Sequence, residues 1–279
     1  MLTITEIKRL MEKFDFRPKK KAGQHFIIDR NIVDKLIRFA DIGNEDLVLE
    51  IGAGIGNITR DIANVAKTVY ALEFDKVLCN VLKTTLSGYV NIKPICQNIL
   101  KFDFKAYGQK QKLRIIGNLP YYITTPILER IIENKDYIED ALLMVQKEMA
   151  ERMLAKHGGK TYSPITCYVQ YYTRPELKSI VKRNSFFPKP EVDSVLIYLK
   201  VLDTPSISVN NEKLFFKIVK TTFNQRRKML SSSLGYKKRL GVDKEQARQI
   251  LLKAGVAADK RPEALSLEEF ARITNEFPG

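Results

Sequence analysis

One stretch of the sequence, LVLEIGAGIGNIT from Leu47 to Thr59, predicts the fold. It begins with an apolar run of strand character that ends at Glu50, and glycines at alternate positions lead into a helical pattern. Glycines allow the backbone to pass beneath a ligand at a strand–helix turn, where a larger residue would not fit. The spacing is G-x-G-x-G, whereas dinucleotide-binding turns carry G-x-G-x-x-G. The stretch therefore indicates an α/β fold whose turn holds a nucleoside with a short amino-acid tail.

An acidic residue follows at the distance that such a turn requires. The next apolar run, 68–72, predicts a second strand that ends at Glu73. A carboxylate at this place can accept hydrogen bonds from both ribose hydroxyls of a nucleoside. A solvated carboxylate at a strand end is the alternative, which the spacing and the following helical pattern disfavour. A third strand, 91–96, precedes Asn98. We expect the amide of Asn98 to hydrogen-bond the edge of an adenine base in the bound nucleoside.

The fourth expected strand, 113–117, leads into NLPYY at positions 118–122. In open α/β sheets, ligands bind outside the carboxyl ends of the strands. An amide and flat rings at that edge suit a planar base that carries an exocyclic amine. Taken alone, the stretch also suits a strand-ending turn, because Asn and Pro favour turns. Its place after the glycines, Glu73 and Asn98 favours the chemical role, with Tyr122 expected only to pack.

The charge balance indicates a polyanionic partner. The chain has 279 residues, with 47 Lys and Arg against 32 Asp and Glu, for a formal net charge of +15. Such an excess repels itself unless RNA, DNA or an anionic membrane surface neutralises it. The sequence opens without a signal pattern, and no apolar run approaches membrane-spanning length. We therefore expect a soluble, cytoplasmic monomer.

Cysteine and histidine usage disfavours a metal site. The three cysteines, Cys79, Cys96 and Cys167, are scattered and form no CxxC pair. An odd, scattered set fits a reducing compartment and predicts neither a disulfide framework nor a metal site. The two histidines, His25 and His157, are too few for a multi-histidine site. We expect no metal.

Three lysines, Lys19, Lys20 and Lys21, form a basic run after Pro18 and lead into a polar and aromatic loop, 22–29. A run of this kind can bind phosphate groups, and it can equally be a solvated loop. Because it stands next to the loop, we place these lysines among the candidate RNA-binding residues.

A short polar linker with proline, DTPS at 203–206, is the best candidate for a domain boundary. It predicts an α/β domain of residues 1–203 with a basic N-terminal extension, and a small helical domain of residues 204–279. Within the first domain, residues 166–172 alternate like a strand.

Two basic clusters lie in the helical domain. Arg226, Arg227 and Lys228 end its first amphipathic helix, and a second cluster covers 236–239. On a small helical domain such clusters suit an RNA backbone, although they can serve solubility alone. The α/β domain ahead of them, with its expected nucleoside-binding turn, favours RNA.

The series of strand, glycine turn, acid, amide and NLPY resembles the class I S-adenosylmethionine-dependent methyltransferases that act on an exocyclic amine. Five motifs, spread over nearly the full length, look like the KsgA (RsmA) type of ribosomal RNA adenine dimethyltransferase. They are GQHF at 23–26, EIGAGIG at 50–56, NLPY at 118–121, FFPKPEVDS at 186–194 and FNQRRK at 223–228. The last two are the specific ones, because Erm-type large-subunit methyltransferases share only the first three.

The resemblance implies a Rossmann-like sheet with a helical C-terminal domain, and S-adenosyl-L-methionine as cofactor. It further implies N6-dimethylation of two adjacent adenosines near the 3′ end of small-subunit (16S) ribosomal RNA, within an immature small subunit. The residues implied to contact the cofactor, two glycines of the strand–helix turn among them, are His25, Ile27, Gly52, Gly54, Glu73, Asn98 and Asn118.

Two positions depart from the family's commonest pattern. His25 stands where Asn is frequent, and Asn98 stands where Asp is usual. A ring nitrogen can replace an amide as a polar contact. An amide at Asn98 can still accept from the adenine amine, although a carboxylate would make the stronger, charge-assisted bond.

The chemistry implied by this resemblance centres on Asn118. We expect its side-chain oxygen and the carbonyl of Leu119 to accept both hydrogens of the adenine amine, so that the nitrogen lone pair points at the methyl group. Pro120 fixes the direction of the carbonyl. Tyr121 and Phe186 stack on the adenine, which must swing out of the RNA stack.

Two other classes remain open. An Erm-type enzyme would modify large-subunit RNA. A non-catalytic assembly or transcription factor on the same fold would keep the basic surface and lose the cofactor groups, whereas Gly52, Glu73 and Asn118 are intact in this chain.

Overall fold

The computed structural model describes residues 1–19 and 23–278. Two compact units emerge, a sheet unit of Met1–Ala150 with Arg174–Val201 and a helical unit of Glu151–Thr173 with Leu202–Gly279. The switch after Val201 lies beside the boundary predicted at 203. The segment Glu151–Thr173, predicted to lie in the first domain, belongs to the same unit as the C-terminal helices instead.

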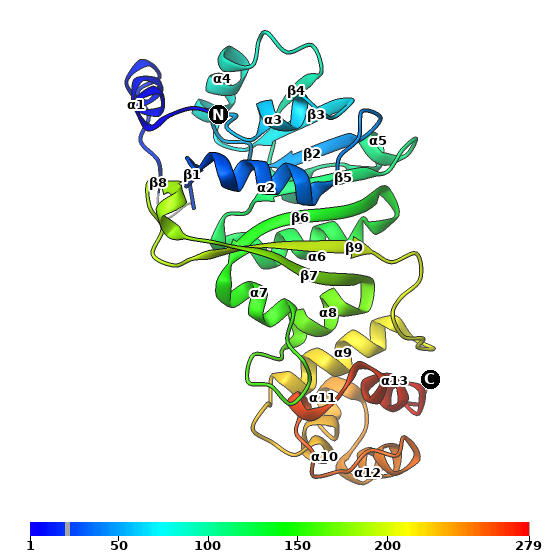
Figure 1. The fold of residues 1–279 in the computed structure, drawn as a ribbon. Coiled ribbons are helices and arrows are strands. Elements are labelled where there is room, and N and C mark those ends of the chain that lie inside the picture. Colours follow the sequence, from blue (N-terminus) through cyan, green and yellow to red (C-terminus); the bar gives the residue numbers. More distant parts are fainter. Residues whose placement is uncertain (20–22, 279) are drawn as a thin grey trace. The chain divides into compact units, whose positions relative to one another are not determined.

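Seven strands of the described residues form the main sheet, in the order β4-β3-β2-β5-β6-β9-β7 (Figure 1). Their bounds are β2 Leu47–Ile51, β3 Thr68–Glu73, β4 Ile92–Cys96, β5 Leu113–Asn118, β6 Ile138–Gln146, β7 Thr173–Val181 and β9 Ser194–Val201. Strands β2 to β6 pair in parallel, and β9 runs antiparallel to β6. Because Ile51 stands opposite both Leu72 and Gly117, the carboxyl ends of β2, β3 and β5 meet at one edge.

Helices connect these strands and cover the sheet. Their bounds are α1 Ile4–Lys13, α2 Arg30–Ala40, α3 Thr59–Ala63, α4 Lys76–Thr85, α5 Phe104–Gly108, α6 Thr124–Glu133 and α7 Lys147–Met153. In Figure 1, α2 lies in front of the sheet and α6 behind it. A separate two-stranded antiparallel sheet pairs β1 Phe26–Ile27 with β8 Phe186–Phe187.

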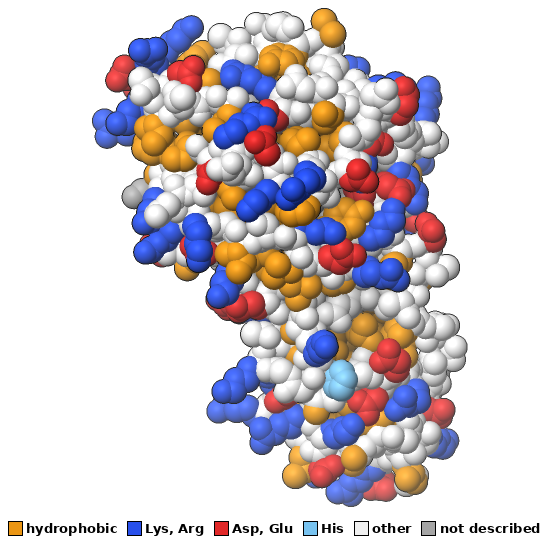
Figure 2. Space-filling view, viewed as in Figure 1, with side chains coloured by type: hydrophobic (Ala, Val, Ile, Leu, Met, Phe, Trp, Pro, Cys, Tyr) orange, Lys and Arg blue, Asp and Glu red, His pale blue; other side chains and the backbone are white. Residues whose placement is uncertain are grey.

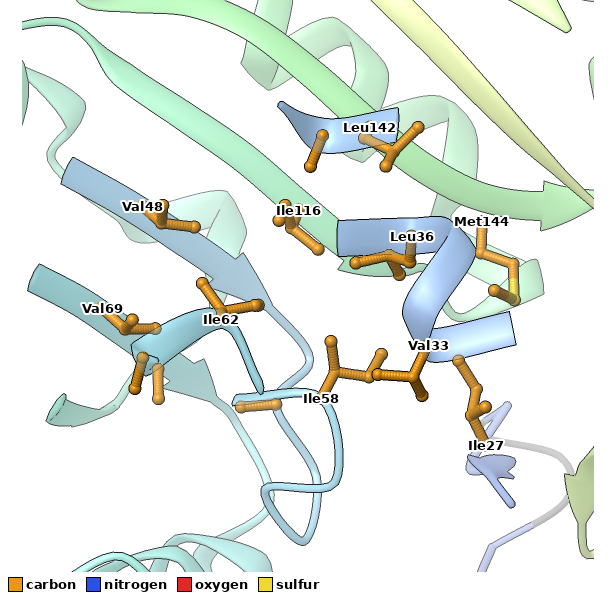
Figure 3. Packing of buried hydrophobic residues seen from close by; sticks show 14 of the residues in the cluster. Ile27, Val33, Leu36, Val48, Ile58, Ile62, Val69, Ile116, Leu142 and Met144 are labelled. Atoms are coloured by element: carbon orange, nitrogen blue, oxygen red, sulfur yellow. The ribbon is translucent and has the colours of Figure 1, made fainter. Parts of the chain in front are cut away.

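The core on one face of the sheet forms because apolar residues recur at helical spacing in α2 and at alternate positions in the strands. Helix α2 buries Val33 and Leu36, three residues apart, and its N-cap Asp29 accepts from the Asn31 N–H. Figure 3 shows these two side chains among the buried residues of one cluster, which also holds Ile58 and Leu142. Alternate strand residues face the other way and are equally buried, as expected of a sheet covered on both faces.

The helical unit is built from short helices around aromatic contacts. Its helices are α8 Pro164–Tyr172, α9 Glu212–Phe223, α10 Leu230–Leu234, α11 Lys237–Leu240, α12 Lys244–Lys253 and α13 Leu267–Asn275. Residues 166–172, predicted as a strand, are helical in α8. Ser163 forms a capping box with Thr166, and the ring of Tyr171 packs 5.1 Å from that of Phe215. Capping and tertiary packing therefore override the local alternation of residue types.

A disulfide joins Cys79 of α4 to Cys96 at the end of β4, with Cα atoms 5.7 Å apart. The prediction that the cysteines form no disulfide is therefore wrong. The pair is separated by 17 residues in sequence, but Cys96 stands beside Glu73 in the sheet, and α4 begins shortly after Glu73. Cys167 is free and buried, as expected of a small core residue.

Lys and Arg side chains are spread over the visible face of both units in Figure 2, interspersed with Asp and Glu. Within residues 1–19 and 23–278, no helix is both long enough and apolar enough to cross a membrane.

Candidate active site

A pocket of the sheet unit lies at the carboxyl ends of β2, β3 and β5. Its walls come from the segment before β1, the glycine turn after β2, and the residues that follow β3, β4 and β5. All seven residues expected to contact the cofactor line it: His25, Ile27, Gly52, Gly54, Glu73, Asn98 and Asn118. Positions far apart in sequence converge because parallel strands end at the same edge.

The glycine turn is left-handed at each of its glycines. Gly52, Gly54 and Gly56 have φ values of 75°, 59° and 80°, a region that other residues rarely adopt. A Cβ on Gly54 would also lie only 3.2 Å from the ring of Phe26. Glycine is therefore required for both the conformation and the close approach of β1.

Glu73 is fixed by the backbone around it. One carboxylate oxygen accepts from the Gly54 N–H at 2.9 Å, and the other accepts from the N–H groups of Phe74 and Asp75 at 2.8 Å. Burial nevertheless raises the pKa of this carboxyl above its usual value. The side chain therefore presents acceptors to the pocket in one orientation.

Glu50 is a pocket residue whose role the spacing of the motifs does not indicate. It lines the pocket, is 2% exposed, and its Oε2 has no hydrogen-bond partner among the described residues. Burial, with a smaller contribution from the nearby Glu73, raises its pKa to about 7. A buried carboxylate oxygen without a partner is costly, so a cationic group of a ligand would complete the site. The available signal was an acid that ends an otherwise apolar strand.

Asn118 is oriented by the segment on the opposite wall. Its Nδ2 donates to the backbone carbonyl of His25 at 2.8 Å, which leaves its Oδ1 as the acceptor for a ligand. The His25 ring is held in turn, because its Nδ1 lies 2.6 Å from the carbonyl oxygen of Pro188, an arrangement that requires a proton on Nδ1. The amide is thus preorganised before any substrate arrives.

Asn98 caps a short helix with the same oxygen that is expected to contact adenine. Its Oδ1 accepts from the Leu100 N–H at 2.9 Å at the start of the helix Ile99–Lys101. Because an amide oxygen has two lone pairs, Oδ1 can also accept from the adenine amine, and the Nδ2 group can donate to a ring nitrogen.

The other NLPY residues divide in an unexpected way. Leu119 is buried, and its N–H donates to the Met144 carbonyl at 3.0 Å. Tyr121 is partly exposed; its ring stacks beside His25 at 5.8 Å, and its hydroxyl lies 2.9 Å from that of Ser194. Tyr122, expected only to pack, is 58% exposed and lines the pocket together with Pro120. That expectation for Tyr122 is wrong.

Phe186 does not occupy the predicted stacking position. Its side chain is 2% exposed and belongs to the core cluster that also holds Ile27 and Leu196. Successive residues of a strand point to opposite sides, so Phe187 leaves this cluster and packs near Phe26 instead. Phe186 is a core residue, and the assignment of a base-stacking role to it is corrected.

The predicted RNA-binding residues have different environments. Lys20 and Lys21 lie outside the described residues. The ammonium group of Lys19 is 2.7 Å from the Asp75 carboxylate, so its charge is already paired. Arg226 donates to the Lys160 carbonyl at 2.8 Å and lies 3.6 Å from Glu263, both within the helical unit.

Arg227 and Lys228 are exposed, as an RNA contact requires. Of the three neighbouring cations after α9, Arg226 therefore serves to hold parts of the helical unit together.

Comparison with known proteins agrees with this geometry. The family model described as ribosomal RNA adenine dimethylase matches residues 15–278. Among curated relatives, "Ribosomal RNA small subunit methyltransferase A" of Clostridioides difficile (strain 630) is 42% identical, over 96% of this chain and 93% of that protein. The protein of the same name from Clostridium botulinum (strain Loch Maree / Type A3) is 39% identical, over 96% of this chain and 97% of that one.

Solved structures show the same fold. A dimethyladenosine transferase from Plasmodium falciparum superimposes with a TM-score of 0.75 at 27% identity, covering 89% of this chain and 96% of that one. The 23S rRNA methyltransferase ErmE gives a TM-score of 0.71 at 25% identity, over 90% of this chain and 99% of that one. The fold is that of the class I S-adenosylmethionine-dependent methyltransferases, as the sequence predicted. The chain belongs to the ribosomal RNA adenine dimethylase family.

Proposed function

We propose that this protein transfers methyl groups from S-adenosylmethionine to N6 of two adjacent adenosines near the 3′ end of small-subunit ribosomal RNA. The substrate is that RNA within an immature small subunit in the cytoplasm, and the enzyme acts as a monomer. The names of the two clostridial relatives support the choice of subunit. The net charge of +15 supports a polyanionic substrate.

The pocket has a donor and acceptor set that fits S-adenosylmethionine. Glu73 would hold the ribose hydroxyls and the Asn98 amide would bond the adenine edge, while the left-handed glycines leave room for the nucleoside. The Glu50 carboxylate, whose Oε2 has no partner among the described residues, would take the α-ammonium group. When bound, S-adenosylmethionine supplies an activated methyl group on sulfur.

The observation that carries the proposal is the fixed amide of Asn118. Because its Nδ2 is held by the His25 carbonyl, its Oδ1 is free to accept one N–H of an adenine amine. The Leu119 carbonyl would accept the second. Two acceptors draw the amine away from planarity, so that its lone pair is exposed for reaction. Orientation of this kind, rather than a strong base, would supply most of the acceleration.

The adenine itself needs an aromatic surface once it leaves the RNA stack. Tyr121 has a ring whose direction is fixed by Ser194 and His25, and Tyr122 has an exposed ring at the pocket. We assign the base-holding role to Tyr121 and assistance at the rim to Tyr122. Arg227 and Lys228, which are exposed, would contact RNA phosphates.

The test is to map dimethylated adenosines after incubating the protein and labelled S-adenosylmethionine with immature small subunits or with naked large-subunit RNA. We expect two adjacent modified adenosines near the 3′ end of the small-subunit RNA only. Modification of the large-subunit RNA alone would identify an Erm-type enzyme instead. If neither RNA is modified and calorimetry detects no binding of S-adenosylmethionine, the protein is a non-catalytic factor.

A further inference from the structure

Asp75 is a buried carboxylate that joins two walls of the pocket without lining it. It is 9% exposed and caps α4, because its Oδ1 accepts from the Val77 N–H at 3.0 Å. Its own N–H donates to Glu73 at 2.8 Å. One side of Asp75 is therefore part of the wall that holds Glu73 in place.

Its other oxygen binds the opposite wall. Asp75 Oδ2 accepts from the ammonium group of Lys19 at 2.7 Å and from the side-chain amide of Gln24 at 3.3 Å. Gln24 also accepts the Lys19 N–H through its Oε1, at 2.7 Å. Burial of Asp75 acts in the opposite direction, but these bonds prevail and lower its pKa, so that it is an anion facing two donors.

The segment held by Asp75 continues directly onto Asn118. The residue after Gln24 is His25, whose carbonyl accepts from the Asn118 amide. On its other side, Gly23 packs so closely on Pro120 that a Cβ would lie 2.9 Å from the proline Cα. A shift of Gln24 would therefore move both the partner of Asn118 and the packing of the NLPY segment.

We propose that Asp75 is a positioning residue for methyl transfer: its Oδ2 ties Gln24 in place, so that the His25 carbonyl aims the Asn118 amide at the target amine. The proposal rests on the proposed function, in which Asn118 orients that amine. Asp75 itself touches neither the pocket nor the reacting atoms.

Asp75→Asn tests this with little disturbance of the helix, since Asn also caps helix N-termini. The new amide group replaces Oδ2 and faces the donors of Lys19 and Gln24. We expect turnover on immature small subunits to fall about tenfold, because small misplacements of reacting groups are costly. The Kd for S-adenosylmethionine, measured by calorimetry, should rise by a smaller factor than turnover falls, because Glu73 keeps its backbone bond to Asp75 and only the wall that carries His25 and Ile27 is loosened.

Hydrogen exchange gives a readout that needs neither cofactor nor RNA. Backbone amides in 23–27 should exchange faster in Asp75→Asn, whereas those of α4 should keep their rates. The matched control is Asp103→Asn, which alters the exposed N-cap of α5 and should leave both turnover and exchange unchanged.

Swapping the amide and the carboxylate between positions 24 and 75 tests the hydrogen bond between these two side chains. In the double variant Gln24→Glu with Asp75→Asn, the new amide can donate to the new carboxylate, so the link is restored in the opposite direction. We expect turnover of the double variant within about threefold of the wild type. Wild-type turnover in Asp75→Asn, or a double variant no faster than Asp75→Asn, would overturn the proposal.

Failure of the proposed function would look different. In that case the wild-type chain would not methylate immature small subunits at all, although the exchange experiment would still report whether Asp75 holds 23–27. Should Asp75→Asn fail to fold, Gln24→Glu alone removes the same link from the other side. Unchanged exchange in 23–27 and unchanged turnover for that variant would likewise contradict the inference.

Discussion

The pocket of the sheet unit and the basic end of α9 both carry motifs typical of the family, yet their residues behave differently. In the pocket, Glu73 and Asn118 are each fixed by backbone groups and directed to one space. At the end of α9, Arg226 bonds its own unit while Arg227 and Lys228 extend into solvent.

The difference arises from geometry. Strands of a parallel sheet end at one edge, so a residue's place after a strand predicts where it lies. Residues 224–227 form a turn, in which neighbours in sequence point in different directions. A motif therefore predicts a shared role more reliably at strand ends than along a turn.

Removing the Glu73 carboxylate, which backbone N–H groups hold in place, should strongly weaken cofactor binding. Glu73→Ala takes away the proposed ribose acceptors and leaves three backbone N–H groups without a partner. We expect the Kd for S-adenosylmethionine to rise by at least about 100-fold, which corresponds to about 3 kcal/mol. Calorimetric titration measures it. A Kd within a few-fold of wild type would show that the pocket does not bind ribose through Glu73.

Truncation of the two tyrosines compares a fixed ring with an exposed one. Tyr121→Ala should raise the KM for the RNA substrate about 10- to 100-fold, because stacking is worth about 1–3 kcal/mol per base. Tyr122→Ala should have the smaller effect, and Tyr121→Phe should stay near wild type. Steady-state methylation of immature small subunits measures all three. A larger loss for Tyr122→Ala would reverse the assignment of the base-holding ring.

Glu50 predicts a pH dependence of cofactor binding. With a pKa of about 7, the carboxyl gains its charge as pH rises through neutrality, and affinity for a cationic ligand should rise with it. Glu50→Gln should bind S-adenosylmethionine about tenfold more weakly than wild type above about pH 8, and should lose most of this pH dependence. Titrations at several pH values test it; a parallel pH profile in the variant would exclude Glu50 as the charge partner.

The Glu50 carboxyl also makes the free energy of unfolding depend on pH. A folded-state pKa raised from 4.5 stabilises the protein below the pKa of the unfolded chain, and this contribution is lost as pH rises through about 7. The free energy of unfolding should therefore fall less between these pH values in Glu50→Gln than in wild type. Denaturant titration of both proteins provides the comparison.

Substitutions at Arg226, Arg227 and Lys228 should give the smallest effects. Some should change RNA binding and the other should change stability. Arg227→Ala with Lys228→Ala should weaken RNA binding a few-fold and reduce the slope of log K against log salt by about 2. Arg226→Ala should instead lower the stability of the helical unit by about 1 kcal/mol, through loss of its bond to the Lys160 carbonyl. Filter binding at several salt concentrations and thermal unfolding separate the two. An unchanged salt slope in the double variant would remove Arg227 and Lys228 from the RNA surface.

Much of the fold was predictable because its signals are local. The apolar strands, the alternate glycines and the acid that ends β3 each follow from spacing, and parallel pairing brings them to one edge. The expected cofactor residues line one pocket for that reason. The helical state of residues 166–172 was missed because capping by Ser163 and packing on Phe215 outweigh local alternation.

The remaining site residues depend on contacts that sequence spacing does not encode. Phe186 turns into the core because β8 pairs with β1, which lies far away in sequence. Cys79 meets Cys96 through the pairing of β3 with β4. Glu50 owes its raised pKa mainly to burial, with a smaller contribution from Glu73. Each of these required knowledge of which segments lie side by side.

The central claim is that Asn118 orients the target amine without being needed to hold the cofactor. The most direct measurement is single-turnover methylation of immature small subunits by Asn118→Ala, paired with a calorimetric titration of S-adenosylmethionine into the same variant. We expect methyl transfer to slow by at least about 1,000-fold, while the Kd for the cofactor stays within about threefold of wild type. Methylation at a near wild-type rate would contradict the claim. Equal loss of cofactor binding and turnover would also contradict it, because Asn118 would then only build the pocket.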